Sequence, residues 1–216
     1  MPSDHARFIR DNTRALPVPS IPSIQLYQAD AVTPLWLMTE QDLARERLDP
    51  PFWAFAWAGG QAMALYVLEH PHIVKSKRVL DIACGSGLVG IAAMEAGAAG
   101  VLCNDIDPYA PACVQLNAKL NKVDIAFAKG NLLDDPLPDV DLILAGDICY
   151  EKTMSKAMLT YFRRALRQGI EVYIGDPHRS YFPKTGLRRL KTYDIMTHTD
   201  IEDSAVKPAS VWKMET

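Results

Sequence analysis

The sequence predicts an α/β fold: a Rossmann-like, doubly wound sheet of seven strands with a C-terminal antiparallel hairpin, preceded by an N-terminal extension that is helical or irregular. Two observations carry this prediction. From residue 78 onward, short apolar runs alternate with segments of helical period, which is typical of a parallel sheet covered by helices. The last two extended segments have no stretch of crossover length between them, so we expect them to pair as a hairpin at one edge.

The alternation gives each element a range. Expected strands span 78–82, 101–104, 125–128, 140–145, 170–174, 190–199 and 209–214, and expected helices span 60–69, 88–96, 108–120 and a segment through 158–166. Earlier, residues 4–15 are expected to form a helix. Three prolines between 17 and 22 predict an extended connector, because proline fixes φ, and 24–27 and 35–38 are strand-like. Residues 1–49 should pack as an extension on a main domain at 50–216.

Composition narrows the class of protein. With 216 residues, 49% hydrophobic and 23% charged, the chain suits one globular domain. A net charge of −3 gives no electrostatic reason to expect a nucleic-acid partner, and no apolar run is long enough to span a membrane. The four cysteines form no C-x-x-C pair, so we expect free thiols in a reducing compartment and no metal. We expect a cytoplasmic monomer.

The stretch 79–90 contains an apolar strand, a loop with Gly85 and Gly87, and the start of a helix. Read literally, it matches the G-x-G-x-x-G dinucleotide fingerprint, with Asp105 lying 20 residues after Gly85 where a ribose-binding acid is expected. However, a dinucleotide places its pyrophosphate at this helix N-terminus, where Asp81 would repel it. S-adenosylmethionine carries an ammonium and a sulfonium instead, so Asp81 favours that cofactor by orienting the ammonium directly or through water. A dehydrogenase remains the alternative.

Polar residues at the next strand ends agree with a nucleoside ligand. Asp105 can accept hydrogen bonds from both ribose hydroxyls, and Asn131 can read the adenine edge with its amide. Each residue alone has a simpler explanation, because Asp and Asn are common in turns. Their occurrence in register on successive strands predicts a binding site.

Asp81-x-Ala83-x-Gly85-x-Gly87 resembles motif I of the class I, seven-strand S-adenosylmethionine-dependent methyltransferases, in which Gly is usual at the position of Ala83. The resemblance implies that these four residues bind the cofactor. The sequence Gly146-Asp147-Ile148-Cys149-Tyr150 is similar to the Asp-x-x-Tyr motif of a group of protein-lysine methyltransferases. It implies catalytic roles for Asp147 and Tyr150.

Further motifs extend the resemblance over almost the whole chain. The sequences at 8–13, 57–62, 104–108 and 174–179 resemble those of the electron transfer flavoprotein β-subunit lysine methyltransferases, which usually have Gly at the position of His178. The resemblance implies methylation of a lysine of that subunit, by a member of bacterial type. A ribosomal protein or a small amine remains an alternative substrate. A non-catalytic adaptor is a third possibility, although the retained cofactor motif counts against it.

Several residue roles stay open at this point. The aromatic stretch at 52–57 either covers the sheet or forms a pocket wall, and Trp57 is expected to face the cofactor or the lysine stem. Asp147 either orients the incoming amine or caps the helix that begins nearby. Tyr150 either supplies a hydroxyl group or packs the channel, whose apolar lining would lower the pKa of the lysine. Cys84 and Cys149 are expected to be packing residues.

Overall fold

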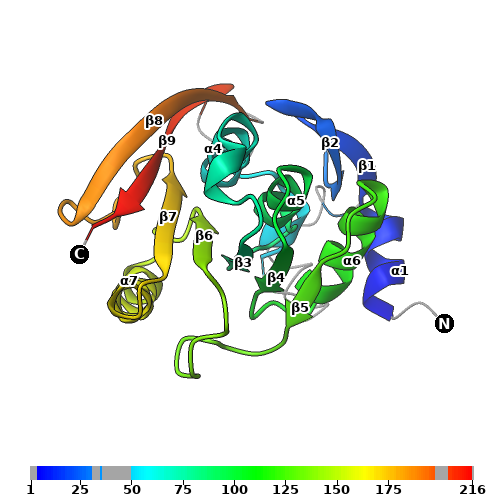
Figure 1. Ribbon diagram of the computed structural model, residues 1–216. Helices are drawn as coiled ribbons and strands as arrows, with labels where there is room; N and C mark the ends of the chain where they lie inside the picture. The colour runs from blue at the N-terminus through cyan, green and yellow to red at the C-terminus, as the bar shows by residue number, and fades with distance from the viewer. Residues whose placement is uncertain (1–3, 31–34, 36–49, 198–203, 216) are drawn as a thin grey trace.

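The computed structural model describes residues 4–30, Leu35, 50–197 and 204–215. Its main feature is a seven-stranded sheet of order β5-β4-β3-β6-β7-β9-β8 (Figure 1). Neighbouring strands from β5 to β7 are parallel, whereas β9 is antiparallel to both β7 and β8. The strands are β3 (Arg78–Ile82), β4 (Gly100–Asn104), β5 (Ala126–Ala128), β6 (Leu142–Gly146), β7 (Glu171–Asp176), β8 (Leu187–Met196) and β9 (Val206–Met214). The predicted fold class and terminal hairpin are confirmed.

Helices cover both faces of this sheet, as Figure 1 shows. The helices are α1 (Asp4–Asn12), α4 (Ala58–Glu69), α5 (Leu88–Glu95), α6 (Ala110–Leu120) and α7 (Lys152–Arg167), with short 3-10 turns at Phe52–Ala54 and Pro71–Ile73. α4, α5 and α6 lie on one side of the sheet and α7 lies on the other. No helix in the described part of the chain is long and apolar enough to cross a membrane.

The alternation of side chains along β3 links the two layers. Leu80 and Ile82 pack in the cluster that α7 buries, whereas Val79 packs in the cluster of α4 and α5. Asp81 lies on the same face as Val79, because strand side chains alternate. The acid is therefore directed toward α5, which begins seven residues later, at Leu88.

The N-terminal part differs from its prediction. The expected helix at 4–15 is too long: α1 ends at Asn12, and β1 (Arg14–Val18) pairs antiparallel with β2 (Ile21–Gln28). The prolines do make this segment extended, but they lie in and between two paired strands. The hairpin rests on α6, because Asn117 accepts a hydrogen bond from the backbone of Tyr27 at 2.8 Å. Of the strand-like piece at 35–38, only Leu35 lies among the described residues.

The N-terminus of α4 contacts the ends of β6 and β7 backbone to backbone. A Cβ added at Gly59 would fall on the carbonyl oxygen of Gly175, and one added at Gly175 would fall on the carbonyl oxygen of Gly59. A Cβ at Gly146 would lie 2.8 Å from the Cα of Gly60. Glycine is required at 59, 146 and 175 because no side chain fits between the two backbones at these positions. We call these four residues the glycine junction.

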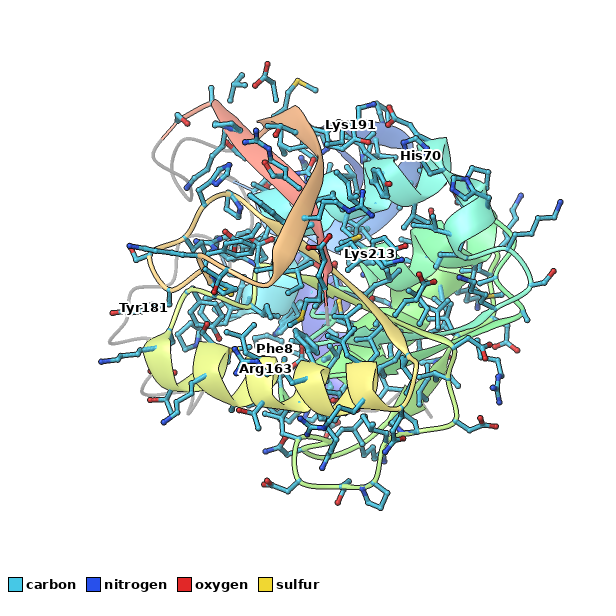
Figure 2. The ribbon with its side chains drawn as sticks, turned by 60° about the vertical axis from the view of Figure 1, so that its left-hand side comes forward. Phe8, His70, Arg163, Tyr181, Lys191 and Lys213 are labelled. Carbon is cyan, nitrogen blue, oxygen red and sulfur yellow. The ribbon has the colours of Figure 1, made fainter. Side chains whose placement is uncertain are left out.

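The C-terminal hairpin is tied to the far end of α4. Lys191 of β8 reaches the Glu69 carboxylate at 2.7 Å, and Figure 2 shows Lys191 and His70 on the same side of the molecule. Lys213 of β9 pairs with Glu171, which also accepts from Lys77 at 2.8 Å. α4 is thus held at both ends, by close packing at its N-terminus and by charge at its C-terminus.

The glycine junction predicts a large difference between two equal substitutions. Gly175→Ala should lower the free energy of unfolding by about 2 kcal/mol or more, because the new methyl group forces α4 away from the sheet. Gly100→Ala is the matched control, since nothing lies within 4 Å of a Cβ at that strand position. Urea denaturation of both variants measures the difference. Equal stability of the two would contradict the junction.

Candidate active site

A cavity of about 530 Å³ opens at the carboxyl ends of β3, β4 and β6. Its size lies within the range of roughly 300–1,000 Å³ that small-molecule sites occupy. It is lined by eight of the nine residues predicted for the site: Trp57, Asp81, Ala83, Gly85, Asp105, Asn131, Asp147 and Tyr150. The ninth, Gly87, is not a lining residue. It is the N-cap of α5 with φ 79°, so it shapes the loop from behind.

Asp81 holds the start of α5. Its Oδ2 accepts a hydrogen bond of 2.8 Å from the backbone N–H of Gly90, the third residue after the helix N-cap. The Asp81 carboxyl group therefore already occupies the helix N-terminus at which a dinucleotide would place its pyrophosphate. The side chain is 1% exposed, and burial raises the pKa of Asp81 to about 7, against the lowering effect of Gly90. Whether Asp81 also orients the cofactor ammonium stays a prediction.

The departure from the usual motif I sequence falls at a strained position. Ala83 has φ 52°, a left-handed conformation that costs a residue with a Cβ about 1–2 kcal/mol. Gly85 follows with φ 48°. The loop thus needs two left-handed residues in close succession, which explains why Gly is usual where this chain has Ala83.

Asp105 connects two loops of the cavity. Its Oδ2 accepts a hydrogen bond of 2.8 Å from the backbone N–H of Gly85, and its Oδ1 accepts one of 3.0 Å from the backbone N–H of Asp107. Asn131 is exposed and accepts from the backbone of Leu133 at 3.0 Å. Ile106 also lines the cavity and is 77% exposed. The motif at 104–108 contained Ile106, but the sequence analysis assigned this residue no role.

The aromatic stretch serves both purposes that the sequence left open. Phe52 and Trp57 line the cavity with ring centroids 5.8 Å apart, and Phe52 approaches Tyr150 at 5.3 Å. Trp53 is 2% exposed and stacks on Tyr109 in the core. One stretch therefore forms a cavity wall and covers the protein interior.

Asp147 is a helix cap, but not of the helix that follows it. Glu151 caps α7 by accepting hydrogen bonds from the backbone N–H groups of Thr153 and Met154. Of the two alternatives that the sequence left open for Asp147, capping of that helix is therefore wrong. The Oδ2 of Asp147 instead accepts a 2.7 Å hydrogen bond from Gly60, in the first turn of α4. That contact exists only because the glycine junction brings α4 to the strand end.

Arg179 holds the other carboxylate oxygen of Asp147. Its Nη2 and Nε lie 2.8 and 3.2 Å from Oδ1, and its guanidinium carbon lies 5.7 Å from the Trp57 ring centroid. Asp176 orients this loop, because its Oδ1 accepts a hydrogen bond of 2.7 Å from the backbone N–H of Arg179. His178 between them has φ 63°, which explains why Gly is usual there. Arg179 had no assigned role in the sequence analysis, although the motif at 174–179 contained it.

Two cysteines and one tyrosine in or near the cavity are held in their protonated forms. Burial raises the pKa of the Cys149 thiol to about 11 and that of Cys84 well above its usual value. Burial also raises the pKa of Tyr150. These groups are therefore neutral near pH 7, which agrees with the expected packing role of the cysteines and leaves Tyr150 as a neutral phenol.

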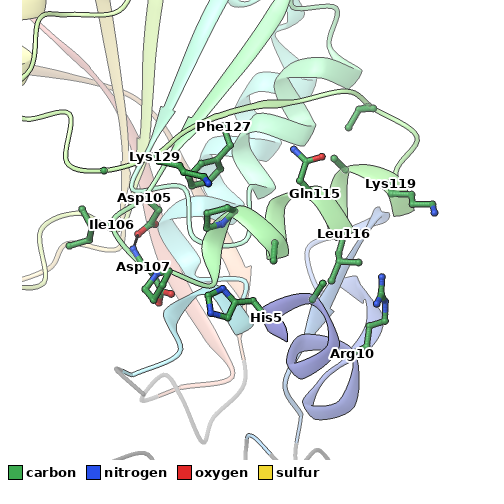
Figure 3. Close-up of a pocket in the computed structure, with 17 residues that line it drawn as sticks. His5, Arg10, Asp105, Ile106, Asp107, Gln115, Leu116, Lys119, Phe127 and Lys129 are labelled. Atoms are coloured by element: carbon green, nitrogen blue, oxygen red, sulfur yellow. Dashed lines mark hydrogen bonds between the residues drawn. The ribbon is translucent and has the colours of Figure 1, made fainter. Parts of the chain in front are cut away.

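A second, larger groove of about 890 Å³ lies on the other side of the loop at 105–107 (Figure 3). It runs between α1 and α6, with His5 and Arg10 on one wall and Lys119 and Lys129 among its other lining residues. Of the nine predicted site residues only Asp105 reaches it. The smaller cavity is therefore the candidate active site.

The comparisons with known proteins agree with this geometry. Residues 34–149 match the ribosomal protein L11 methyltransferase family. The electron transfer flavoprotein beta subunit lysine methyltransferase of Xenopus laevis is 35% identical over 214 residues, covering 96% of this chain and 86% of that relative. The human protein of the same name is 31% identical, and the match covers 95% of this chain and 80% of that relative. The chain belongs to this lysine methyltransferase family.

Solved structures of the same fold lie at lower identity. Ribosomal protein L11 methylase from Lactobacillus delbrueckii subsp. bulgaricus aligns with a TM-score of 0.53 at 21% identity, over 75% of this chain and 81% of that one. Magnesium protoporphyrin IX methyltransferase from Synechocystis PCC 6803, solved with bound SAM, aligns with a TM-score of 0.52 at 18% identity. The alignment covers 73% of this chain and 80% of that one. These likenesses show the methyltransferase fold.

The family makes this protein an S-adenosylmethionine-dependent methyltransferase, and the cavity fits that cofactor. Within the described residues, the charged side chains that line the cavity are Asp81, Asp105, Asp107, Asp147 and Arg179. Four acids and one paired arginine favour a ligand with an ammonium and a sulfonium over one with phosphates.

The buried acid at the loop predicts a pH-dependent stability. The unfolded-state pKa of an aspartate is near 3.9, so between about pH 4 and 7 the folded protein binds a proton at Asp81 that the unfolded chain does not. The free energy of unfolding therefore falls as the pH rises through this window. Asp81→Asn cannot ionise and keeps an acceptor for Gly90. It should be more stable than the wild type at pH 8, on the order of 3 kcal/mol.

Denaturation curves of the cofactor-free protein at pH 5 and pH 8 measure this effect. The gain in the free energy of unfolding from Asp81→Asn should shrink toward pH 5. Asp124→Asn is the control, because it makes the same substitution at an exposed site. Asp176, whose pKa burial also raises to about 7, is present in both proteins and cancels in the comparison. A gain independent of pH would contradict an ionised, buried Asp81.

Proposed function

We propose that the protein methylates a lysine side chain of the electron transfer flavoprotein β subunit. The observation that carries this proposal is the near-full-length similarity to lysine methyltransferases named for that substrate, together with Asp147 at the cavity wall. S-adenosylmethionine supplies the methyl group, because its sulfonium is an activated leaving group. The free thiols of the described cysteines suit the cytoplasm.

The nucleoside end of the cavity is assigned to β3, β4 and β5. Asp105 accepts the ribose hydroxyls while its two backbone partners keep the carboxylate in place, and Asn131 reads the adenine edge. Ala83, Gly85 and Gly87 shape the loop that approaches the cofactor, and Trp57 forms the facing wall. Hydrogen bonds to an ionised acceptor contribute about 1.5–3 kcal/mol each.

The substrate end is assigned to Asp147 and the aromatic wall. A lysine ammonium has a pKa of about 10.4, and transfer requires the neutral amine. Phe52, Trp57 and Tyr150 surround the entering stem with apolar surface, which favours the neutral form. Asp147 accepts a hydrogen bond from the amine and directs its lone pair along the line of displacement. Tyr150 packs this channel or adds a hydroxyl group.

A ribosomal protein is the second candidate substrate. It is favoured by the family match over residues 34–149 and by 39% identity to the ribosomal protein L11 methyltransferase of Acinetobacter baumannii, over 46% of this chain and 34% of that relative. Each of those matches covers only about half of this chain. The lysine methyltransferases also match the N-terminal hairpin and the C-terminal strands, so they are the better guide to the substrate.

Labelled S-adenosylmethionine distinguishes the two substrates directly. With the purified electron transfer flavoprotein β subunit we expect label in the protein band, and intact-mass analysis should show one or more methyl additions at lysine. Ribosomal protein L11 and the free amino acid lysine serve as parallel acceptors. Label that appears only in one of these would reject the proposed substrate and leave the methyltransferase fold unaffected.

Two substitutions should separate cofactor binding from methyl transfer. Asp105→Ala should weaken the cofactor by tenfold to about a hundredfold, since it removes a charged acceptor. Asp147→Ala should leave cofactor affinity close to that of the wild type and lower the single-turnover rate. Calorimetric titration and rapid-quench kinetics measure the two quantities. Equal loss of cofactor affinity in both variants would show that Asp147 does not belong to the substrate end.

A further inference from the structure

Arg179 is built into the wall of the active site at the carboxylate that faces the substrate amine. Its side chain is 19% exposed and that of Asp147 is 10% exposed, so the ion pair is largely shielded from water. Among the described residues, its guanidinium contacts the Asp147 carboxylate and the face of Trp57, and its backbone N–H donates a hydrogen bond to Asp176. Such an arrangement orders the guanidinium before the substrate arrives.

An unneutralised carboxylate would work against the reaction. A negative charge within a few ångströms stabilises the protonated form of an amine, and this attraction is stronger where water is excluded. The ammonium has no lone pair with which to attack a methyl group. Asp147 alone would therefore orient the substrate and at the same time hold it in its unreactive form.

We propose that Arg179 is a positioning residue that cancels the charge of Asp147, so that the carboxylate orients a neutral amine instead of trapping an ammonium. The inference rests on the proposed function, since it assigns the amine to Asp147. A carboxylate offers about four acceptor sites, enough to serve Gly60, Arg179 and the amine together. Arginine suits this role because its guanidinium stays protonated throughout the working pH range.

The proton balance follows from this assignment. The substrate ammonium releases its proton to solvent water before transfer. The nitrogen lone pair then forms the bond to the methyl carbon, and the electrons of the broken carbon–sulfur bond remain on sulfur. Asp147 stays ionised and Arg179 stays protonated at every stage, so neither residue has to be reset between turnovers.

The other titratable groups around this pair are the same in the wild type and in both Arg179 variants. Asp176, at the end of β7, has its pKa raised to about 7 by burial. From the segment after β6, Cys149 has a pKa of about 11 and Tyr150 a raised one, both through burial. Asp105 lines the same cavity, and His178 precedes Arg179 and contacts Ser210. α4 presents Gly59 and Gly60, which carry no side chain.

The pH dependence of turnover tests the proposal. In Arg179→Gln the apparent pKa of the rise in kcat should move upward by at least about one unit, so the rate at pH 7.5 falls about tenfold or more and recovers toward pH 9.5. Arg179→Lys retains a positive charge and should keep a profile close to that of the wild type. Single-turnover measurements with the lysine substrate, at saturating cofactor, give the profiles.

A second variant keeps the test decisive if Arg179→Gln is poorly folded. In the double variant Asp147→Asn/Arg179→Gln no charge remains to be cancelled, so its profile should return toward the wild-type pKa even though its rate is lower. An equal loss at every pH in Arg179→Gln, with an unshifted profile, would overturn the role of Arg179. A wild-type enzyme that leaves lysine unmodified at all pH values would instead reject the proposed function.

Discussion

The close approach of α4 to the ends of β6 and β7 is the contact on which the active site depends. Gly59 and Gly175 bring two backbones together at a distance that excludes any side chain. This contact places the N–H of Gly60 on Asp147 and sets Trp57 at the cavity wall. Three motifs that are far apart in the sequence, at 57–62, 146–150 and 174–179, therefore describe one junction in space.

The same interaction, an aspartate side chain that accepts a hydrogen bond from the first turn of a helix, occurs twice around the cavity. Asp81 accepts from the third residue after the N-cap of α5, and Asp147 accepts from the third residue after the N-cap of α4. In each case a carboxylate carried on a strand end satisfies a helix N-terminus that would otherwise attract an anion. The protein supplies its own anions, so the space between the two helices suits a cationic cofactor and an amine. This is the physical reason that a loop of dinucleotide type here serves S-adenosylmethionine.

Periodicity was sufficient to identify the strands and helices from residue 78 onward, because each has a local pattern. The bounds of the terminal hairpin were less accurate: β8 begins at Leu187 and β9 at Val206, each three residues before its predicted start, and positions 198–199 of the predicted strand lie outside the described residues. Periodicity was insufficient where pairing decides the structure, as at Arg14, which leaves the helical pattern to join β2. For the site as well, local patterns could be predicted from the sequence and contacts between distant segments could not. Asp81, Asp105 and Asp147 could be found from their places after strands, but their partners could not. Gly60 lies 87 positions before Asp147, and only the packed fold shows that they meet.

The left-handed residues show how the chain accepts strain to build this site. Ala83, Asp147 and His178 each follow a strand that ends at the cavity, and each has φ between 52° and 63°. A chain that leaves a parallel strand and turns at once toward a ligand needs such a residue, and Gly meets the need without strain. Ala83 and His178 stand where Gly is usual, so a Cβ is tolerated there at a cost. At Asp147 glycine would relieve the strain but remove the carboxylate that caps α4 and pairs with Arg179. Strain at that position is therefore the direct consequence of placing an acid where the strand turns into the site.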